Sequence, residues 1–281
     1  MASCCKHRGS ELVTSTPQYQ VRTLDRALHI LGVFTLEQPE LTLSEISMRT
    51  DLSPSTALRL LSILTQYGYI ERSPDTDRFR IGVGMFERGS IYIQSTTLEA
   101  EATPVLETLA RMTNHTASLA VLDRTEIVHI AVIQPERAIR YFAPVGQREA
   151  AHCTGLGKVL LAGLSDQAVE DVVAQRGLSR RTDRTITTFT ALQAHLAQVK
   201  KQGYAIDNEE SMVGLRCVAA PVFDDRNRLV AAVSSSGQSA EFNDSSLPHL
   251  IRLVQDAALS VSLRLGHRVV TPSAKDRSDN E

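Results

Sequence analysis

Two helix-start signals lie close together in residues 41–68, LTLSEISMRTDLSPSTALRLLSILTQYG, and they limit what this part of the chain can fold into. Thr42 and Glu45 have the S/T-x-x-E spacing of a capping box, which predicts a helix beginning directly after Thr42. Ser53 followed by Pro54 predicts a second helix, because a hydroxyl caps the free N–H groups and proline has no N–H to lose there. We therefore predict two short helices joined by a tight turn.

The second predicted helix has two different faces. Apolar residues at i, i+3, i+4 and i+7 predict a buried face made of Ala57, Leu60, Leu61 and Leu64. The opposite face carries side chains that can hydrogen-bond phosphates or base edges, namely Ser55, Thr56, Arg59 and Ser62. This arrangement is typical of a helix-turn-helix whose second helix enters a DNA major groove. The alternative is an ordinary helical hairpin with one solvated face.

A β-hairpin is predicted directly after these helices. Residues 69–72 and 78–81 alternate apolar and charged side chains, and residues 73–77 are turn-forming. An amphipathic helix upstream is expected to pack across the pair through Leu24, Ala27, Leu28, Leu31 and Phe34. Three helices followed by a hairpin form a winged helix. Arg78 and Arg80 of the hairpin are then expected to reach phosphates or the minor groove.

Length and composition bound the class of protein. At 281 residues the chain is long enough for about two domains. A net charge of −2 argues against non-specific coating of nucleic acid, although a sequence-specific binder needs only a local basic face. No apolar run approaches the ~20 residues that span a bilayer, so we expect a cytoplasmic protein with no membrane partner. The cysteines, including Cys4 and Cys5 in a polar tail, do not form a disulfide framework.

From residue 98 onward the pattern changes to an α+β domain with one central sheet. Strands are predicted at 116–122, 126–133, 139–145, 204–207, 215–223 and 229–235. Helices are predicted near residues 98–109, 166–175, 192–202 and 250–265. Residues 83–97 between the two parts are predicted to form a linker helix, and no nucleotide-binding glycine loop is expected there, because the third glycine of the pattern is absent.

Two catalytic patterns are incomplete in the second half. Gly157-Lys158 resembles the end of a phosphate-binding loop, but the pattern needs glycine in place of His152 and a hydroxyl in place of Val159. His152 and Cys153 are expected to lie on an extended strand, where neighbouring side chains point to opposite faces and cannot act as base and nucleophile. No catalytic residue is therefore assigned.

Neither a metal site nor a cofactor is expected. A zinc site from His152, Cys153 and Cys217 would lack paired ligand spacing. Glu209 and Glu210 are consecutive and diverge, so we expect solvated loop residues and not an acid–base pair.

Taken together, the motifs over residues 21–266 resemble those of the IclR family of bacterial transcriptional regulators. The N-terminal motifs are LDRALHIL, LTLSEIS, SPSTALRLL, YGYIER and FRIG. The C-terminal motifs, which are the more specific, are HCTGLGKVLLA, TDRTI, GYAIDNEE and GLRCVAAPVFD. Small departures from the family pattern are Ser47 for alanine, Phe79 for tyrosine, and a wing turn without its usual glycine.

The resemblance implies an organisation into five parts. These are a disordered tail (1–19), a winged helix-turn-helix (20–82), a linker helix (83–97), a GAF/PAS-like effector-binding domain (98–267) and a second disordered tail (268–281). It also implies a homodimer or homotetramer that binds a pseudopalindromic operator. Such a regulator, more often a repressor than an activator, controls a catabolic operon in response to a small organic acid or aromatic effector.

If the family arrangement holds, three stretches converge on one effector site. Its expected residues are Tyr141, Gly155, Leu156, Asp207, Leu215, Cys217, Ser234 and Ser236. A helix that begins at Gly155 offers free N–H groups and a positive dipole end to a carboxylate. A charged Asp207 would repel that carboxylate unless it is protonated or accepts from a ligand hydroxyl, which favours a hydroxylated, keto or hydrated ligand.

Three other interpretations stay open on the sequence alone. In the first, the serines are merely polar strand residues and Cys217 is a small core residue. In the second, the C-terminal domain is an enzyme that uses Cys153 or Cys217 on the bound molecule. In the third, the winged helix contacts protein and not DNA.

Overall fold

The computed structural model describes residues 21–35, 37–95, 97–135, 144–242 and 245–268. The contacts divide the chain into two compact units, with the division between Ser95 and Thr96. Within the described residues, no helix is long and apolar enough to cross a membrane. The predicted N-terminal tail (1–19) lies outside these residues, and so does the predicted C-terminal tail except for Arg268.

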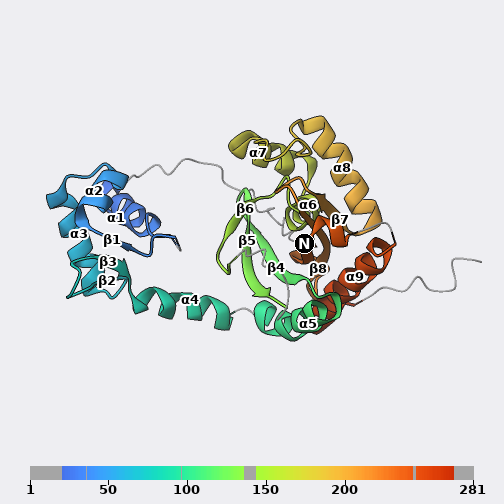
Figure 1. Ribbon diagram of the computed structural model, residues 1–281, viewed down its shortest axis with the longest axis horizontal. Helices are drawn as coiled ribbons and strands as arrows, with labels where there is room; N and C mark the ends of the chain where they lie inside the picture. The colour runs from blue at the N-terminus through green and yellow to red at the C-terminus, as the bar shows by residue number, and fades with distance from the viewer. Residues whose placement is uncertain (1–20, 36, 96, 136–143, 243–244, 269–281) are drawn as a thin grey trace, which may run out of the picture. The chain divides into compact units, whose positions relative to one another are not determined.

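The first unit is a winged helix-turn-helix, as predicted. Its helices are α1 (Arg22–Gly32), α2 (Leu43–Thr50) and α3 (Pro54–Gln66), and its strands are β1 (Glu40–Leu41), β2 (Ile70–Arg72) and β3 (Phe79–Ile81), in the order β1-β3-β2 (Figure 1). The predicted capping box is confirmed, since the Glu45 N–H donates to Thr42 Oγ1 and the Thr42 N–H donates to the Glu45 carboxylate. Ser53 Oγ caps α3 by accepting from the Thr56 N–H.

Helix α1 corrects the predicted apolar face. Leu24 and Leu28 are 57% and 58% exposed, whereas Ile30 is completely buried. Among the residues packed into the core, Ala27, Ile30, Leu31 and Phe34 repeat at helical spacing, and Val33 joins them directly after the helix. The first four of these also have i, i+3, i+4, i+7 spacing, so the helix carries two overlapping apolar stripes. Periodicity could not choose between them, and packing against α2 and α3 selects the second.

Helix α4 (Val83–Ser95) covers most of the residues predicted as a linker helix (83–97), and a close backbone contact joins its start to the turn after α3. The Gly84 N–H donates to the Gly68 oxygen at 2.9 Å. A Cβ on Gly82 or Gly84 would lie 2.3 or 2.7 Å from that same oxygen, so neither position has room for a side chain. These glycines therefore serve packing, which explains why they form no nucleotide loop.

The second unit contains a six-stranded antiparallel sheet in the order β6-β5-β4-β9-β8-β7 (Figure 1). Its strands are β4 (Thr116–Asp123), β5 (Glu126–Ile133), β6 (Arg148–Ala150), β7 (Ala205–Asn208), β8 (Leu215–Phe223) and β9 (Leu229–Gln238). Strand β6 was not predicted. Of the strand predicted at 139–145, residues 139–143 lie outside the described part, and Pro144 and Val145 are not in a strand.

Helices cover both faces of this sheet. One core cluster contains α5 (Thr97–Thr113) and α9 (Leu247–Arg264), and the other contains α6 (Gly155–Ala162), α7 (Asp166–Arg176) and α8 (Phe189–Gln202). A short 3₁₀ helix, η1 (Ser239–Glu241), follows β9. The α+β class and the α/β effector-domain architecture are confirmed. The face under α6 carries the polar side chains described below.

Candidate DNA-binding surface and effector site

Helix α3 presents the four predicted DNA-facing residues on its surface. Ser55, Arg59 and Ser62 are exposed and Thr56 is half-buried. The hydroxyls of Ser55 and Thr56 lie 3.2 and 2.9 Å from Ser53 Oγ, next to the helix start. Arg59 makes no ion pair with any described residue, so its guanidinium is free for an external partner.

The two predicted arginines of the wing are engaged within their own unit. Arg78 donates to the Glu40 backbone oxygen at 3.3 Å and lies 3.5 Å from the Glu45 carboxylate. Arg80 donates two hydrogen bonds to the Glu71 carboxylate, at 3.0 and 3.2 Å. The hydrogen bond from Arg80, with a second from a backbone N–H, lowers the pKa of Glu71. Both arginines must leave or share these partners to contact phosphates.

The candidate effector site is built around the start of α6. Thr154 caps this helix by accepting from the Gly157 N–H at 3.1 Å, and Gly155 and Leu156 form the first turn, as predicted. A Cβ on Gly155 would lie 3.1 Å from Cys217 Sγ, so glycine lets the helix start approach strand β8 closely. Gly157 has backbone atoms of Ala151 even nearer, at 2.2 Å from an ideal Cβ.

Polar residues from four strands line up beneath this helix start. The register pairs Asp207 with Cys217, Cys217 with Ser236, and Ser236 with Thr116. Ser234 lies between Ser118 and Ala219 in the next row, and Leu215 begins β8 on the same face as Cys217. The structure therefore brings together seven of the eight predicted effector residues. The eighth, Tyr141, lies outside the described residues.

The hydroxyl of Ser234 is completely buried, and among the described residues its Oγ makes no hydrogen bond of normal geometry, although it lies close enough to the Cys217 sulfur to lower the pKa of that thiol. Buried hydroxyls are normally satisfied, so an orphan one marks a place where a ligand or water is expected. Burial raises the pKa of Cys217 to about 12, and it does the same for Cys153. Both thiols stay protonated at neutral pH, which makes them poor nucleophiles.

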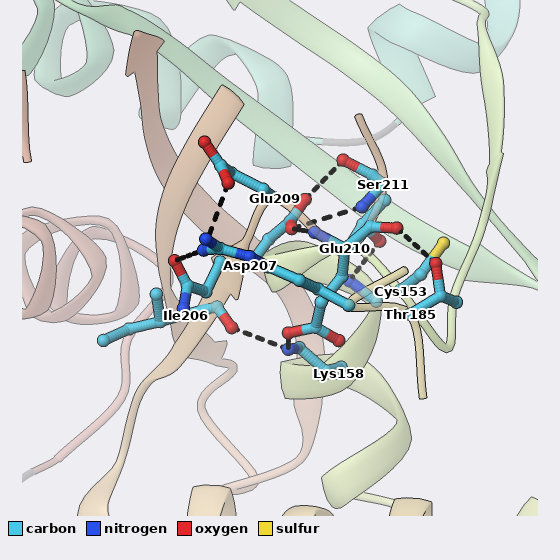
Figure 2. Close-up of polar contacts among 12 residues, drawn as sticks. Cys153, Lys158, Thr185, Ile206, Asp207, Glu209, Glu210 and Ser211 are labelled. Carbon is cyan, nitrogen blue, oxygen red and sulfur yellow. Dashed lines mark hydrogen bonds and ion pairs between the residues drawn. The ribbon is translucent and has the colours of Figure 1, made fainter. Parts of the chain in front are cut away.

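Asp207 is held by the turn that follows its own strand (Figure 2). Its carboxylate accepts from the Glu210 N–H at 2.7 Å, from the Ser211 N–H at 3.3 Å and from the Ser211 hydroxyl. Burial nevertheless raises the pKa of Asp207 to about 6, and these hydrogen bonds oppose the rise. Asp207 therefore shapes the 209–211 turn as well as facing the site.

Glu210 is not a solvated loop residue, and that prediction was wrong. Its carboxylate forms an ion pair with Lys158, whose ammonium also donates to the Ile206 backbone oxygen at 2.6 Å (Figure 2). Thr185 donates its hydroxyl to the Glu210 backbone oxygen at 2.7 Å. The Lys158 side chain is entirely buried by this network, so it is not presented to a phosphate.

The structure changes the reason for rejecting a His152–Cys153 pair. Residues 151–153 form a turn and not the expected extended strand. His152 Nε2 lies 3.1 Å from the Ser179 backbone oxygen, and Cys153 Sγ contacts the Ala150 oxygen. In the part of the chain that the structure describes, no three histidine, cysteine or carboxylate side chains are grouped to hold a metal ion.

Sequence reasoning missed several polar residues of the same sheet face. Thr116 and Ser118 were predicted only as strand residues, and both are buried beside the serines of β9. His129 and Glu149 form a hydrogen-bonded pair further along the face, at 3.1 Å. A polar residue in an otherwise apolar strand run, such as His129 in EIVHIAVI, was the available signal.

A winged helix with an exposed second helix, followed by an α/β domain with a buried polar face, has the architecture of a DNA-binding transcriptional regulator. Two family models match the chain. The IclR helix-turn-helix domain matches residues 23–74, and the bacterial transcriptional regulator IclR C-terminal domain matches residues 90–263. The chain belongs to the IclR family of bacterial transcriptional regulators. It is a DNA-binding transcriptional regulator, and the family consists of regulators and not enzymes.

Relatives and solved structures agree with this assignment. The chain is 36% identical to the HTH-type transcriptional regulator BhcR of Paracoccus denitrificans, covering 88% of each chain. It is 33% identical to the transcriptional repressor IclR of Escherichia coli, covering 92% of this chain and 95% of that one. The crystal structure of an IclR homologue from Microbacterium hydrocarbonoxydans in complex with 4-hydroxybenzoate has a TM-score of 0.77 at 25% identity, covering 86% of this chain and 98% of that one.

Proposed function

We propose that this regulator is a repressor of a catabolic operon, and that a small organic acid or aromatic acid bound beneath α6 controls its affinity for the operator. The observation that carries the proposal is the buried hydroxyl of Ser234 beside the start of α6, which makes no hydrogen bond of normal geometry with any described residue. The free N–H groups of that helix turn suit a carboxylate, and the nearby hydroxyls and thiol suit its other oxygens. The proposed effector residues are those predicted from the sequence.

Repression is the proposed sign of control because relatives over most of the chain are named repressors. These include the transcriptional repressor IclR of Escherichia coli and the HTH-type transcriptional repressor AllR of Salmonella typhimurium, at 33% and 32% identity. The relative crystallised with 4-hydroxybenzoate supports an acid as the class of effector. In that scheme the ligand must bind the operator-free state more tightly than the operator-bound state.

A homodimer or a dimer of dimers is the proposed assembly. Apolar side chains that no other described part of the chain covers lie just before and on α1, at Val21, Leu24 and Leu28, and on α4, at Phe86 and Ile91. A second copy of the chain would bury them and present two α3 helices to a pseudopalindromic operator. The half-sites would then be about 10 base pairs, or a multiple of that spacing, apart.

The test is an operator-binding titration with and without candidate effectors. Purified protein is titrated onto DNA from upstream of its own gene, with random DNA of equal length as the control. A panel of organic and aromatic acids is screened by thermal shift, because a ligand that binds the folded state raises the melting temperature. The proposal requires specific binding to the upstream DNA, weakened by an acid that also stabilises the protein. Binding that no stabilising acid changes would refute it.

A further inference from the structure

A buried polar pair lies on the sheet face that α6 covers, towards the β6 edge, and neither of its residues is among the proposed effector residues. His129 of β5 is 3% exposed, and its Nε2 lies 3.1 Å from the Glu149 carboxylate of β6. The second ring nitrogen, Nδ1, is buried and has no hydrogen-bond partner among the described residues. A buried polar atom without a partner costs free energy, so the structure is poised to receive a group there.

The register shows that this pair faces the same side of the sheet as the serines. His129 is directly opposite Ala120, and Glu149 is directly opposite Ile127. Both Ala120 and Ile127 belong to the core cluster under α6, and directly opposed residues share a face. Ser234 lies one strand beyond β4 and one row further along. From strand spacing and rise, the Cα atoms of His129 and Ser234 are roughly 12 Å apart.

The pKa shifts of the two buried thiols indicate that Glu149 lies near the same site as Asp207. Burial is the main cause of the raised pKa of Cys217, and the charges of Asp207 and Glu149 both add to the rise. The same two carboxylates add to the raised pKa of Cys153. Glu149 therefore acts on the thiols from the opposite side of the site to Asp207. A ligand between α6 and the sheet would have Ser234 near one end and His129 near the other.

The partner of Nε2 decides what Nδ1 can recognise. A carboxylate is an acceptor, so the proton that faces Glu149 is on Nε2, and the proposal takes the tautomer in which this is the only proton on the ring nitrogens. Nδ1 is then left with a lone pair and no proton, which makes it an acceptor. A carboxylate or carbonyl end of a ligand has nothing to donate to it. A hydroxyl or amino group does.

The geometry points to His129, oriented by Glu149, as a second effector subsite that selects organic acids carrying a hydrogen-bond donor at the end remote from the carboxylate. The alternative is that the pair only ties β5 to β6. A purely structural pair would not require the second nitrogen to stay unsatisfied, and changing it would not alter which ligand is preferred. The inference rests on the proposed function, because it needs an acid bound beneath α6.

The experiment measures dissociation constants by calorimetry for matched acids with and without the remote donor. The probes are benzoate with 4-hydroxybenzoate, and pentanoate with 5-hydroxypentanoate and 5-aminopentanoate. In at least one series the wild type should bind the donor-bearing acid about tenfold or more tightly than its parent, as expected for a hydrogen bond within a buried site. Equal affinities within every series would overturn the inference.

Variants separate recognition from folding. The double variant His129→Phe/Glu149→Leu replaces both partners by apolar groups, which avoids leaving a single buried charge. This double variant should keep the affinity for the parent acid and lose the tenfold preference. Glu149→Gln removes one negative charge beside the site, so it should reduce the preference most for 5-aminopentanoate. Asp123→Asn, which changes an exposed carboxylate paired with Arg148 of β6, should leave the preference unchanged.

The outcomes distinguish the two proposals. If parent acids bind and the double variant keeps the wild-type preference, the subsite is wrong while organic-acid control stands. If Ser234→Ala abolishes binding of every acid while the double variant changes only the preference, both are supported. If no acid in any series binds the wild type, control by such acids fails, and the subsite fails with it.

Discussion

The two units use opposite charges in opposite ways. In the wing, Arg80 and Glu71 form an ion pair whose side chains are 54% and 40% exposed. In the effector domain, Lys158 and Glu210 form one whose side chains are 0% and 8% exposed. Exposed pairs contribute about 0–1 kcal/mol to stability. Removal of one partner from a buried pair commonly destabilises a protein by about 3–5 kcal/mol.

The difference matches what each unit does. An arginine in an exposed pair can exchange its carboxylate for a phosphate at little cost in free energy, which is what the proposed role of the wing requires. The Lys158–Glu210 pair connects α6 to the turn after β7, and both α6 and β7 carry residues of the proposed effector site. Replacement of charged residues should therefore affect DNA binding in the first unit and folding in the second.

The largest effect is expected from Lys158→Met. This change leaves the buried Glu210 carboxylate without its cation and should lower the free energy of unfolding by about 3–5 kcal/mol. Urea denaturation followed by circular dichroism measures it. Lys201→Met on the exposed side of α8 is the control and should change stability by less than about 0.5 kcal/mol. Similar losses for the two variants would remove the contrast between buried and exposed charges.

Asp207, the second buried carboxyl of the same region, is expected to make the stability of the protein fall as the pH rises. Its pKa is raised from 3.8 to about 6 by burial, so the folded state binds more protons between these values and loses stability as the pH rises through them. Asp207→Asn should remove about 2–3 kcal/mol of pH-dependent destabilisation between pH 4 and pH 7.5. Unfolding curves for wild type and variant that shift in parallel with pH would show that Asp207 titrates normally.

In the DNA-binding unit, Arg59→Ala tests a charge that has no ion-pair partner among the described residues. Loss of a bidentate base contact should weaken operator binding by about 1–3 kcal/mol and reduce the preference over random DNA. Fluorescence anisotropy on both DNAs measures the two quantities, with Arg111→Ala of α5 as the control. An equal loss on operator and random DNA would instead identify a phosphate contact.

The smallest effect on stability is expected from Arg80→Ala. Breaking its exposed pair with Glu71 should change the free energy of unfolding by less than about 1 kcal/mol. The salt dependence of DNA binding should nevertheless fall by about one phosphate contact, seen as a smaller slope of log affinity against log salt concentration. An unchanged slope would show that Arg80 stays with Glu71 on DNA.

Local signals in the sequence predicted the helix-turn-helix well. The caps at Thr42 and Ser53 depend on residues within three positions of each other, so their chemistry is visible without a fold. The wing and most strands of the second unit followed from alternation and turn residues. Strand β6 is only three residues long and was missed, because, unlike the equally short β2 and β3, it does not flank a short turn-forming run with a matching strand on the other side.

The candidate site was predicted only in part. The motif around Gly155 marks the helix start, but the Lys158–Glu210 pair joins residues separated by 52 positions. Nothing in the local context of Glu210 distinguishes it from the neighbouring Glu209, which forms an ion pair with Arg184 at the surface. Likewise, His129 and Glu149 meet only because β5 and β6 pair in one register. Such contacts follow from the fold and not from spacing.

The glycines at the start of α4 have a genetic consequence. Every change in the first or second base of a glycine codon introduces a side chain or a stop, and at Gly82 and Gly84 any Cβ would collide with the Gly68 oxygen. Most single-base changes in the first two positions of either codon should therefore cause loss of regulation. Alleles altered there would distort the joint between the wing and α4 and so weaken operator binding whether or not the effector is present.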